Sequence, residues 1–302
     1  MRCDQTTRLL SLLLILAGLG FSTAMADTDQ HSMIAPTTWS DQVEQDLVNL
    51  VAKNEQAHQV YARVVRRLRR SGVPAVYVHG VFSHPEVMLD DNVVQRLTKP
   101  AESMDYSDYR RIFVNDKRIR HGVTFYRTYG DLLHQIADQY GVDPYLMLSF
   151  VGVETQYGSF TSKYSVFNSL HTIIHHIPRR AKWAEDEMVA WFIVCRVDNM
   201  DPLLVRGSYA GAFGYGQFMP TSFKKYAVDG DGDGQREPFD WADVLASIAN
   251  YLLKRGQYEV GSTDFSPNSR NWRAVYKYNP SRNYVKAVLE LRSELIKAIE
   301  KS

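Results

Sequence analysis

The sequence predicts a mainly α-helical fold with a minor β component (α+β), and three observations support this prediction. The chain has 302 residues, of which 45% are hydrophobic and 23% are charged, the ordinary balance of a globular protein with a buried core. Several segments carry apolar residues at a spacing of three or four, which is typical of amphipathic helices. The sequence shows no alternation of strand and helix patterns of the kind that a parallel sheet requires.

The overall charge and composition exclude several classes of protein. Lys and Arg total 35 and Asp and Glu total 34, so we expect no nucleic-acid partner, because domains that bind nucleic acid usually carry a basic excess. The composition also excludes a disordered chain, a collagen-like repeat and a polytopic membrane protein. The 18 tyrosines suit a sugar-binding surface and an ordinary core equally well, and composition leaves both open.

Residues 1–26 have the plan of a cleaved secretory signal peptide. Two arginines precede an apolar run over residues 9–21, which is too short to span a bilayer as a helix. A small-x-small cleavage site follows and ends at Ala26. The alternative is an uncleaved membrane anchor. We expect the mature protein to begin near Asp27 and to be soluble in the periplasm of a Gram-negative bacterium.

Residues 27–98 are expected to form an N-terminal helical region. Apolar residues at a spacing of three or four predict one long helix over residues 40–70. Its basic end is either a solvated helix end or a contact surface for an anionic polymer or a membrane. The arginines of this end are Arg63, Arg66, Arg67, Arg69 and Arg70. The β-branched residues of 75–82 favour a strand, although the length of this segment does not decide between strand and helix.

The rest of the chain is predicted to be mostly helical. Gly141 closes one short helix, and Asp143 and Pro144 begin the next as N-cap and first helical residue. Cys195 lies in a strongly apolar segment, so we interpret it as a buried core thiol and not as a nucleophile. The helices are expected at residues 131–140, 143–158, 183–197, 240–255 and 283–301.

Glu154 is the first candidate for chemistry. It is a carboxylate at the end of the apolar helix that begins near Pro144. Apolar surroundings favour the neutral form of a carboxyl group and raise its pKa, which would suit a general acid near neutral pH. The alternative is a surface glutamate in the last turn of the helix, and this stretch alone leaves both interpretations open.

A glycine-rich segment over residues 207–220 is the second candidate. Its glycines are interleaved with tyrosine and phenylalanine, which favours neither a helix nor a regular strand. Such a backbone lets a ligand approach closely between aromatic walls. The segment lacks the Lys-Ser/Thr ending of a phosphate-binding loop. The alternative is a connecting loop without a ligand.

An acidic segment matches an EF-hand calcium loop. Asp229, Asp231 and Asp233 occupy positions 1, 3 and 5, and glycine stands at position 6. The pattern departs at position 12, where Asp240 replaces the usual glutamate and Asp243 follows at position 15. Alternating carboxylates repel one another without a cation, so we expect bound Ca²⁺ and not a solvated acidic turn. A single loop without a partner indicates a structural ion.

Taken together, these segments resemble the lytic murein transglycosylase B family, membrane-bound or soluble periplasmic enzymes that cleave peptidoglycan. The resemblance covers residues from 99 to the C-terminal helix. It implies a lysozyme-like core over residues 99–302, with a helical domain, a small β subdomain and the EF-hand-like calcium loop at 229–243. Its most specific stretches are residues 151–155, 177–181, 207–220, the calcium loop and Tyr278-Asn279.

The family resemblance implies cleavage of the β-1,4 bond between N-acetylmuramic acid and N-acetylglucosamine. The product is a 1,6-anhydromuramoyl end, and Glu154 matches the catalytic residue that acts as acid and then as base. The N-acetyl group of the substrate would stabilise C1, with Asn279 or Ser208 orienting it. Two alternatives are a hydrolysing muramidase on the same fold and a non-catalytic, calcium-stabilised peptidoglycan-binding protein.

The resemblance also implies residues for the sugar, the peptide and the ion. Polar cleft residues are Ser208 and Gln217. Residues that hold the sugar are Tyr251, Tyr278, Asn279 and Tyr284. A basic pair near the glycan and its peptide is Arg179 and Arg180. The calcium ligands are Asp229, Asp231, Asp233, Gln235 and Asp243. We expect a monomer without an organic cofactor that binds peptidoglycan strands, with cell-wall synthesis proteins as further candidate partners.

Overall fold

A computed structural model describes residues 38–98, 104–160 and 162–302 of the chain. The predicted signal peptide lies outside these described residues. Residues 35–302 form one compact unit, which contains all of the described elements. Within the described ranges, no helix is both long and apolar enough to cross a membrane.

The predicted long helix over residues 40–70 was wrong, because two helices occupy this segment. α1 (Asp41–Val51) ends before Ala52, and α2 (Glu55–Arg70) begins after Asn54. The Asn54 side chain caps α2 by accepting a hydrogen bond from the Ala57 N–H. The Lys53 N–H is bound instead to the Nε2 atom of His175, which lies far away in the sequence. The chain therefore turns at a tertiary contact that the local apolar pattern does not reveal.

The segment 75–82, which the sequence left open between strand and helix although its composition favoured a strand, forms a helix. α3 (Ala75–Phe82) follows Pro74, and its buried side chains recur at a spacing of three or four. This face packs against α1 and the core. The β-branched residues disfavour a helix only weakly, and burial of one helical face outweighs that preference. α4 (Asp91–Thr98) then packs on α8 (Val166–His176).

Residues 164–226, which follow the helix that carries Glu154, form two short strands and three α-helices. β1 (Tyr164–Ser165) pairs antiparallel with β2 (Arg206–Gly207), and Tyr164 lies opposite Gly207. α8 leads through a 3-10 turn (Pro178–Arg180) into α9 (Ala181–Val197), which confirms the predicted central helix. Cys195 is buried in α9, in agreement with a core thiol. α10 (Pro220–Tyr226) packs on α9.

A second group of helices surrounds α7 (Pro144–Thr155). The predicted helix at 131–140 is only the end of α6 (Asp116–Tyr140), which Gly141 closes in the left-handed conformation as expected. α7 ends at Thr155 and not at Gly158, because Gln156 adopts a left-handed C-cap. α11 (Trp241–Tyr251) continues as a π-helical turn (Leu252–Gly256). The other members are α5 (Tyr106–Phe113), α12 (Arg270–Tyr278) and α13 (Arg282–Glu300).

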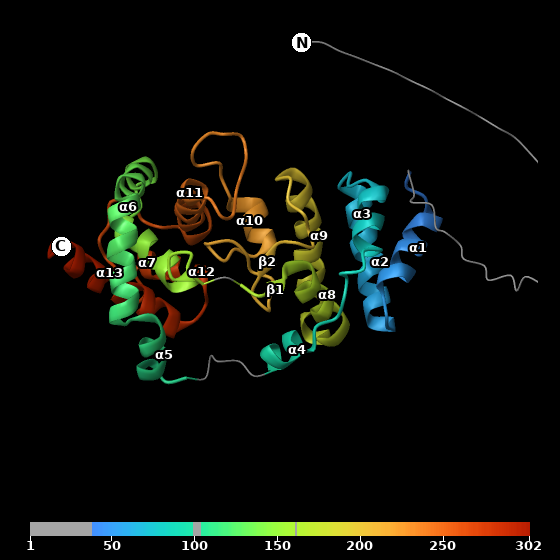
Figure 1. Ribbon diagram of the computed structural model, residues 1–302, viewed down its shortest axis with the longest axis horizontal. Helices are drawn as coiled ribbons and strands as arrows, with labels where there is room; N and C mark the ends of the chain where they lie inside the picture. The colour runs from blue at the N-terminus through green and yellow to red at the C-terminus, as the bar shows by residue number, and fades with distance from the viewer. Residues whose placement is uncertain (1–37, 99–103, 161) are drawn as a thin grey trace, which may run out of the picture. The chain divides into compact units, whose positions relative to one another are not determined.

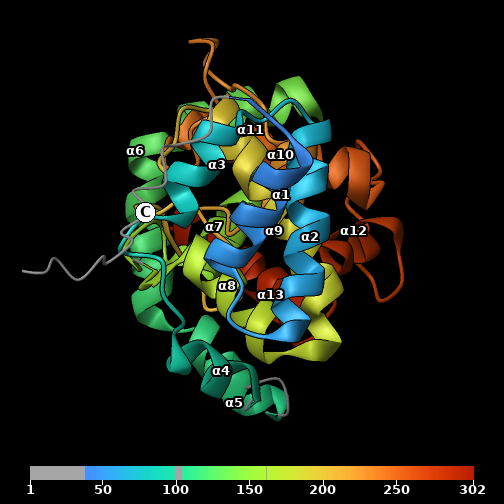
Figure 2. The same cartoon turned by 90° about the vertical axis from the view of Figure 1, so that its right-hand side faces the viewer.

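The two helical groups flank the small sheet and the glycine-rich segment. Figure 1 shows α5, α6, α7, α12 and α13 on one side of β1 and β2, and α1, α2, α3, α8 and α9 on the other. In the turned view of Figure 2, α1 and α2 lie nearest the viewer in front of α8 and α9, against which α2 packs. One continuous apolar core extends through both groups. The antiparallel pair and the glycine-rich segment therefore lie between two groups of packed helices.

Most of the basic end of α2 is engaged in ion pairs. Arg63 and Arg67 bind the buried carboxylate of Glu185 on α9, and Arg67 also binds Asp186. Arg69 pairs with acidic residues in the first turn of α1. These arginines connect helices, which neither of the two sequence interpretations anticipated.

Candidate active site

Glu154 lies in the last turn of α7, and its surroundings fix its position. The Asp143 carboxylate caps the helix by accepting the Leu146 N–H at 2.7 Å, and Pro144 takes the first helical position. Gly152 allows a close approach, because a Cβ atom there would lie 2.6 Å from the Tyr157 hydroxyl. α7 is buried on nearly all sides, but the Glu154 side chain remains partly exposed. Glu154 therefore stands at the accessible end of an otherwise buried, apolar helix.

Opposing effects set the pKa of the Glu154 carboxyl group. Burial disfavours the charged form and raises the pKa, and the net value with all effects included is about 7. The Tyr284 hydroxyl donates a hydrogen bond to Oε1 at 2.5 Å, and the positive charge of Arg118 acts in the same direction. Both lower the pKa, but burial outweighs them. A carboxyl group with this pKa is populated in both protonation states near neutral pH, as a residue that donates and then accepts a proton requires.

Arg118 is a component of the site that sequence reasoning missed. It lies on α6, is only 9% exposed, and donates from Nη1 to the backbone oxygen of Gly152 at 2.7 Å. Its Nε atom is buried without a partner, and the Phe113 ring lies beneath the guanidinium. A basic residue in an amphipathic helix normally faces solvent, so the sequence carries no signal for this buried position.

Three tyrosines predicted to hold the sugar gather around Glu154. Burial, together with the negative charge of Glu154, raises the pKa of the Tyr278 and Tyr284 hydroxyl groups well above the usual value. The Tyr278 hydroxyl donates to the Gly216 carbonyl at 2.6 Å, which fixes the glycine-rich segment against α12. The rings of Tyr251 and Tyr278 meet edge to face with centroids 4.9 Å apart. We call Tyr251, Tyr278 and Tyr284 the tyrosine wall.

The glycine-rich segment forms a tight loop whose two predicted polar residues have different surroundings. The Ser208 hydroxyl accepts the backbone N–H groups of Ala210 and Ala212, so it stabilises the turn of the loop. Gln217 has a left-handed backbone, with φ 50°, and its side-chain amide donates to the Gly214 carbonyl. Gln217 lines an open cavity next to the end of α7.

We call this cavity the loop cleft; its volume is about 250 Å³. Thr155, the neighbour of Glu154, lines it and donates from its hydroxyl to the Tyr215 carbonyl, which joins α7 to the glycine-rich segment. Phe160 and Phe239 at the rim are 62% and 48% exposed, and such aromatic faces suit the apolar faces of sugar rings. The complete lining is Thr155, Gly158, Phe160, Ser162, Arg206, Gly214, Tyr215, Gln217 and Phe239.

Sequence reasoning anticipated few of these lining residues. Within residues 207–220 it identified aromatic walls, which include Tyr215. Phe160, Arg206 and Phe239 come from three other segments, and an isolated exposed aromatic residue or arginine carries no signal in a single sequence.

The remaining predicted substrate residues lie at two other places. Asn279 follows Tyr278 as the C-cap of α12, and its backbone N–H donates to the Val275 carbonyl. Arg179 and Arg180 are exposed in the 3-10 turn between α8 and α9, with the Arg180 guanidinium over the Trp183 ring. This turn packs mainly on α8 and α9. The described contacts thus join Asn279 to the tyrosine wall but do not join the arginine pair to Glu154.

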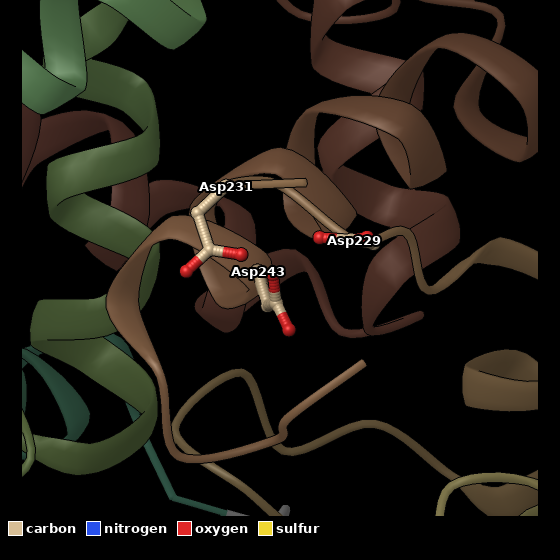
Figure 3. Close-up of side chains that lie close together, drawn as sticks. All are labelled: Asp229, Asp231 and Asp243. Atoms are coloured by element: carbon tan, nitrogen blue, oxygen red, sulfur yellow. The ribbon is translucent and has the colours of Figure 1, made fainter. Parts of the chain in front are cut away.

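The acidic segment gathers three of the predicted calcium ligands. Carboxylate oxygens of Asp229, Asp231 and Asp243 lie within 4.8 Å of one another. Figure 3 shows these side chains close together, with Asp229 and Asp231 on the loop before α11 and Asp243 at the start of that helix. Three carboxylates at this spacing offer the hard oxygen donors that Ca²⁺ prefers, so the donor set fits this ion.

The structure also accounts for the departure at position 12 of the calcium loop. Asp240 is the N-cap of α11 and accepts the N–H groups of Ala242 and Asp243. Asp243, three residues later, is the acidic group that turns toward the loop, and its buried carboxylate accepts the Gly230 N–H at 2.6 Å. The Asp233 carboxylate accepts the Gln235 N–H instead of joining the three-carboxylate group.

The charges that act on Glu154 bear on the reaction it can support. Among the residues that the structure describes, Arg118 is the charged group that shifts its pKa, and no carboxylate contributes. Glycosidases that use water or a protein nucleophile usually place two carboxyl groups about 5–10 Å apart. A carboxyl group whose pKa is raised by burial, without a contribution from another carboxylate, suits a mechanism in which one residue transfers both protons.

Residues 56–267 match the family model described as transglycosylase SLT domain. Over 171 residues the chain is 39% identical to the membrane-bound lytic murein transglycosylase B of Escherichia coli K12. This match covers 56% of the chain and 47% of the relative, so the chain spans about half of the length of that protein.

Solved structures give a similar result for the fold. The soluble lytic transglycosylase SltB1 of Pseudomonas aeruginosa matches with a TM-score of 0.72 and 29% identity, over 80% of this chain and 99% of that one. The Escherichia coli lytic transglycosylase Slt35, solved in complex with calcium, matches with a TM-score of 0.72 and 26% identity, over 82% and 95%. The mainly α-helical architecture with a small antiparallel sheet is therefore that of known lytic transglycosylases.

Proposed function

Because the chain belongs to the transglycosylase SLT domain family, we propose that it is a lytic transglycosylase that cleaves peptidoglycan in the periplasm. The observation that carries the proposal is Glu154, a buried carboxyl group with a pKa of about 7 whose neighbour Thr155 lines an open cleft. The relative named for its action on murein supports the substrate class.

In the first step, Glu154 acts as a general acid. Its carboxyl proton passes to the oxygen that links C1 of N-acetylmuramic acid to the next N-acetylglucosamine, and the C1–O bond breaks. The carbonyl oxygen of the substrate's own N-acetyl group stabilises the positive charge that develops at C1. This role needs no second carboxyl group of the protein, in agreement with the charges around Glu154.

In the second step, the Glu154 carboxylate acts as a general base. It accepts the proton of the muramoyl C6 hydroxyl while O6 forms a bond to C1, and the acetamido group is released. Glu154 thereby returns to its protonated form, and the product has a 1,6-anhydro ring. The Tyr284 hydroxyl stabilises the carboxylate between the two steps by donating to Oε1.

The tyrosine wall and the loop cleft hold the glycan on either side of Glu154. The Tyr278 hydroxyl is committed to Gly216 and the Tyr251 hydroxyl to the Lys277 carbonyl, so both rings have fixed orientations. Asn279 and Gln217 supply polar groups beside these rings. Ser208 acts through the loop that it stabilises, and Arg179 with Arg180 would meet more distant parts of the glycan or its peptide.

Calcium is proposed as a structural ion. Asp229, Asp231 and Asp243 form the core of the ligand set, and Asp233 and Gln235 are the remaining candidates. The ion would neutralise the acidic loop that precedes α11. It takes no part in the proton transfers of Glu154, and no organic cofactor is needed.

Product analysis tests the function directly. Purified peptidoglycan is incubated with the wild type, with Glu154→Gln and with Glu294→Gln, a matched change at a partly exposed glutamate of α13. Mass spectrometry should detect 1,6-anhydromuropeptides from the wild type and from Glu294→Gln. Glu154→Gln keeps the size of the side chain but cannot cycle a proton, so its rate should fall by about 10²–10⁴-fold or more.

Three results would contradict the proposal, each in a different way. Reducing muramic acid ends would show that water attacks C1 and that the protein is a hydrolysing muramidase. Activity of Glu154→Gln within about tenfold of the wild type would assign the acid to another residue. Binding of peptidoglycan without any turnover by the wild type would identify a binding protein.

A further inference from the structure

A basic cavity of about 520 Å³ opens on α12 and has no role in the reaction described above. Its lining consists of Gly256, Gln257, Arg270, Arg273 and Lys277. The volume lies within the range of ~300–1,000 Å³ that is usual for small-ligand sites. We call this cavity the α12 cavity.

The three cations of the α12 cavity have little compensation from acidic groups. Arg270, Arg273 and Lys277 are three and four residues apart and therefore share one face of the helix. In the described part of the chain, the carboxylate within ion-pair distance of any of them is that of Glu259, 3.7 Å from Arg270. Both partners of that pair are exposed, so it neutralises the cavity only weakly. The cavity therefore has an excess of positive charge, which an anionic ligand would neutralise.

The α12 cavity also has hydrogen-bonding groups that are not charged. The Lys277 ammonium donates to the Gln257 side-chain oxygen at 2.8 Å, which holds both groups at the wall. The Gly256 carbonyl lies 3.4 Å from the same ammonium. Amide and carbonyl groups beside guanidinium groups suit a ligand that combines carboxylates with peptide amides.

The last turn of α12 connects the cavity to the candidate active site. Lys277 lines the cavity, and the next residue, Tyr278, belongs to the tyrosine wall beside Glu154. The Lys277 carbonyl accepts the Tyr251 hydroxyl at 2.7 Å. A polymer held at the tyrosine wall would therefore have the α12 cavity within a short distance of the reacting sugar.

We propose that the α12 cavity binds the carboxylate groups of a peptide attached to the glycan strand. The proposal rests on the proposed function, because it takes peptidoglycan as the polymer. The N-acetylated sugars of the strand have no charge that could compensate three cations, whereas the attached peptides carry free carboxylates. Guanidinium groups such as those of Arg270 and Arg273 bind carboxylates through paired hydrogen bonds.

A binding experiment separates the peptide from the sugar. All proteins carry Glu154→Gln so that the polymer stays intact. Their co-sedimentation is measured with intact murein sacculi and with peptide-free strands, which are sacculi whose peptides an amidase has removed and whose freed lactyl carboxylates have then been converted to neutral amides. The test variant adds Arg270→Gln and Arg273→Gln, two exposed side chains. The control adds Arg120→Gln and Arg127→Gln, two exposed arginines of α6, and so removes the same charge. A third variant, Arg270→Lys with Arg273→Lys, keeps the charge.

The test variant should bind intact sacculi about tenfold more weakly, since two charge-assisted contacts are lost. It should bind the peptide-free strands as well as the control does, and the lysine variant should recover part of the loss. Equal weakening on both polymers, or no weakening on either, would overturn the proposal. Loss of binding to phosphatidylglycerol vesicles with full binding to intact sacculi would assign the cavity to a membrane surface instead. If the protein that carries Glu154→Gln alone, with an unchanged α12 cavity, bound neither polymer, the proposed function itself would fail.

Discussion

At Glu154, burial and hydrogen bonding act in opposite directions on one carboxyl group. Burial favours the protonated form of this group, whereas a fully solvated glutamate would be ionised at neutral pH. The Tyr284 hydroxyl and Arg118 bring the pKa back to about 7. The two protein groups that adjust the pKa come from α13 and α6, so the packing of three helices sets the chemistry of one residue.

Replacing Tyr284 with phenylalanine should shift the pH dependence of the reaction upward. The change removes the hydrogen bond that stabilises the Glu154 carboxylate, so the pKa of Glu154 rises. The first step needs protonated Glu154, and activity falls as pH rises through that pKa. In Tyr284→Phe, the falling limb of kcat/KM against pH should move to higher pH by roughly one unit. Tyr276→Phe, a change on α12 away from the wall, is the control; an unmoved or lowered limb in Tyr284→Phe would show that this hydroxyl does not adjust the acid.

At the scale of elements, local patterns located most helices but not their joins. The capping residues Asp143 and Gly141 stand where the sequence indicates, because caps are read within one turn. The break between α1 and α2 depends on His175, more than 120 residues away, and no local pattern contains that contact. The sequence also indicated an unusual carboxyl group at Glu154, but Arg118 and Tyr284 reach it only through tertiary packing.

Asn54→Ala tests whether that join stabilises the protein. Asn54 caps α2, and its side-chain amide also donates to the His175 carbonyl on α8. Loss of both bonds should lower the free energy of unfolding by about 2 kcal/mol in urea titrations. Ser40→Ala removes only the cap of α1 and should cost about 1 kcal/mol. Equal losses in the two variants would show that the bond to α8 contributes nothing.

The packing of α2 on α8 should also make stability depend on pH. His171 and His175 are buried with ring centroids 4.4 Å apart, and Tyr61, Lys53 and His176 face them. Burial lowers the pKa of both histidines below the usual 6.5, so the folded protein keeps them neutral. The unfolded chain binds more protons below that value. Stability is therefore complete above about pH 6.5 and decreases as pH falls, by up to about 1.4 kcal/mol per unit and histidine.

Melting curves between pH 7 and pH 5 measure this effect. His171→Gln should show a smaller decrease in Tm over this interval than the wild type, because one buried group no longer takes up a proton. His84→Gln, a change at an exposed histidine, should follow the wild type. Parallel decreases in all three proteins would mean that carboxylates, and not these histidines, cause the loss of stability in acid.

At the scale of the whole molecule, the acidic loop and the candidate active site depend on the same helix. α11 begins at the three-carboxylate group, and its last residue, Tyr251, belongs to the tyrosine wall. Asp243 is buried in the first turn of this helix and accepts N–H groups from the loop. Repulsion among Asp229, Asp231 and Asp243 would be relieved by a cation. An ion there would hold α11 and, through it, one side of the substrate site.

Calcium should therefore stabilise the folded protein as a whole. An ion that binds only the folded state stabilises it by about 2.7 kcal/mol when its concentration is 100 times Kd, so Tm should be several degrees higher with calcium than with a chelator. Asp231→Ala should abolish this difference, because it removes one of the three clustered carboxylates. Asp264→Ala is the matched control, since Asp264 is also an exposed aspartate that accepts a nearby backbone N–H but lies outside the cluster. Equal Tm values of the wild type with calcium and with chelator would exclude a structural ion at this loop. A calcium-dependent Tm that survives Asp231→Ala would place the ion elsewhere in the molecule.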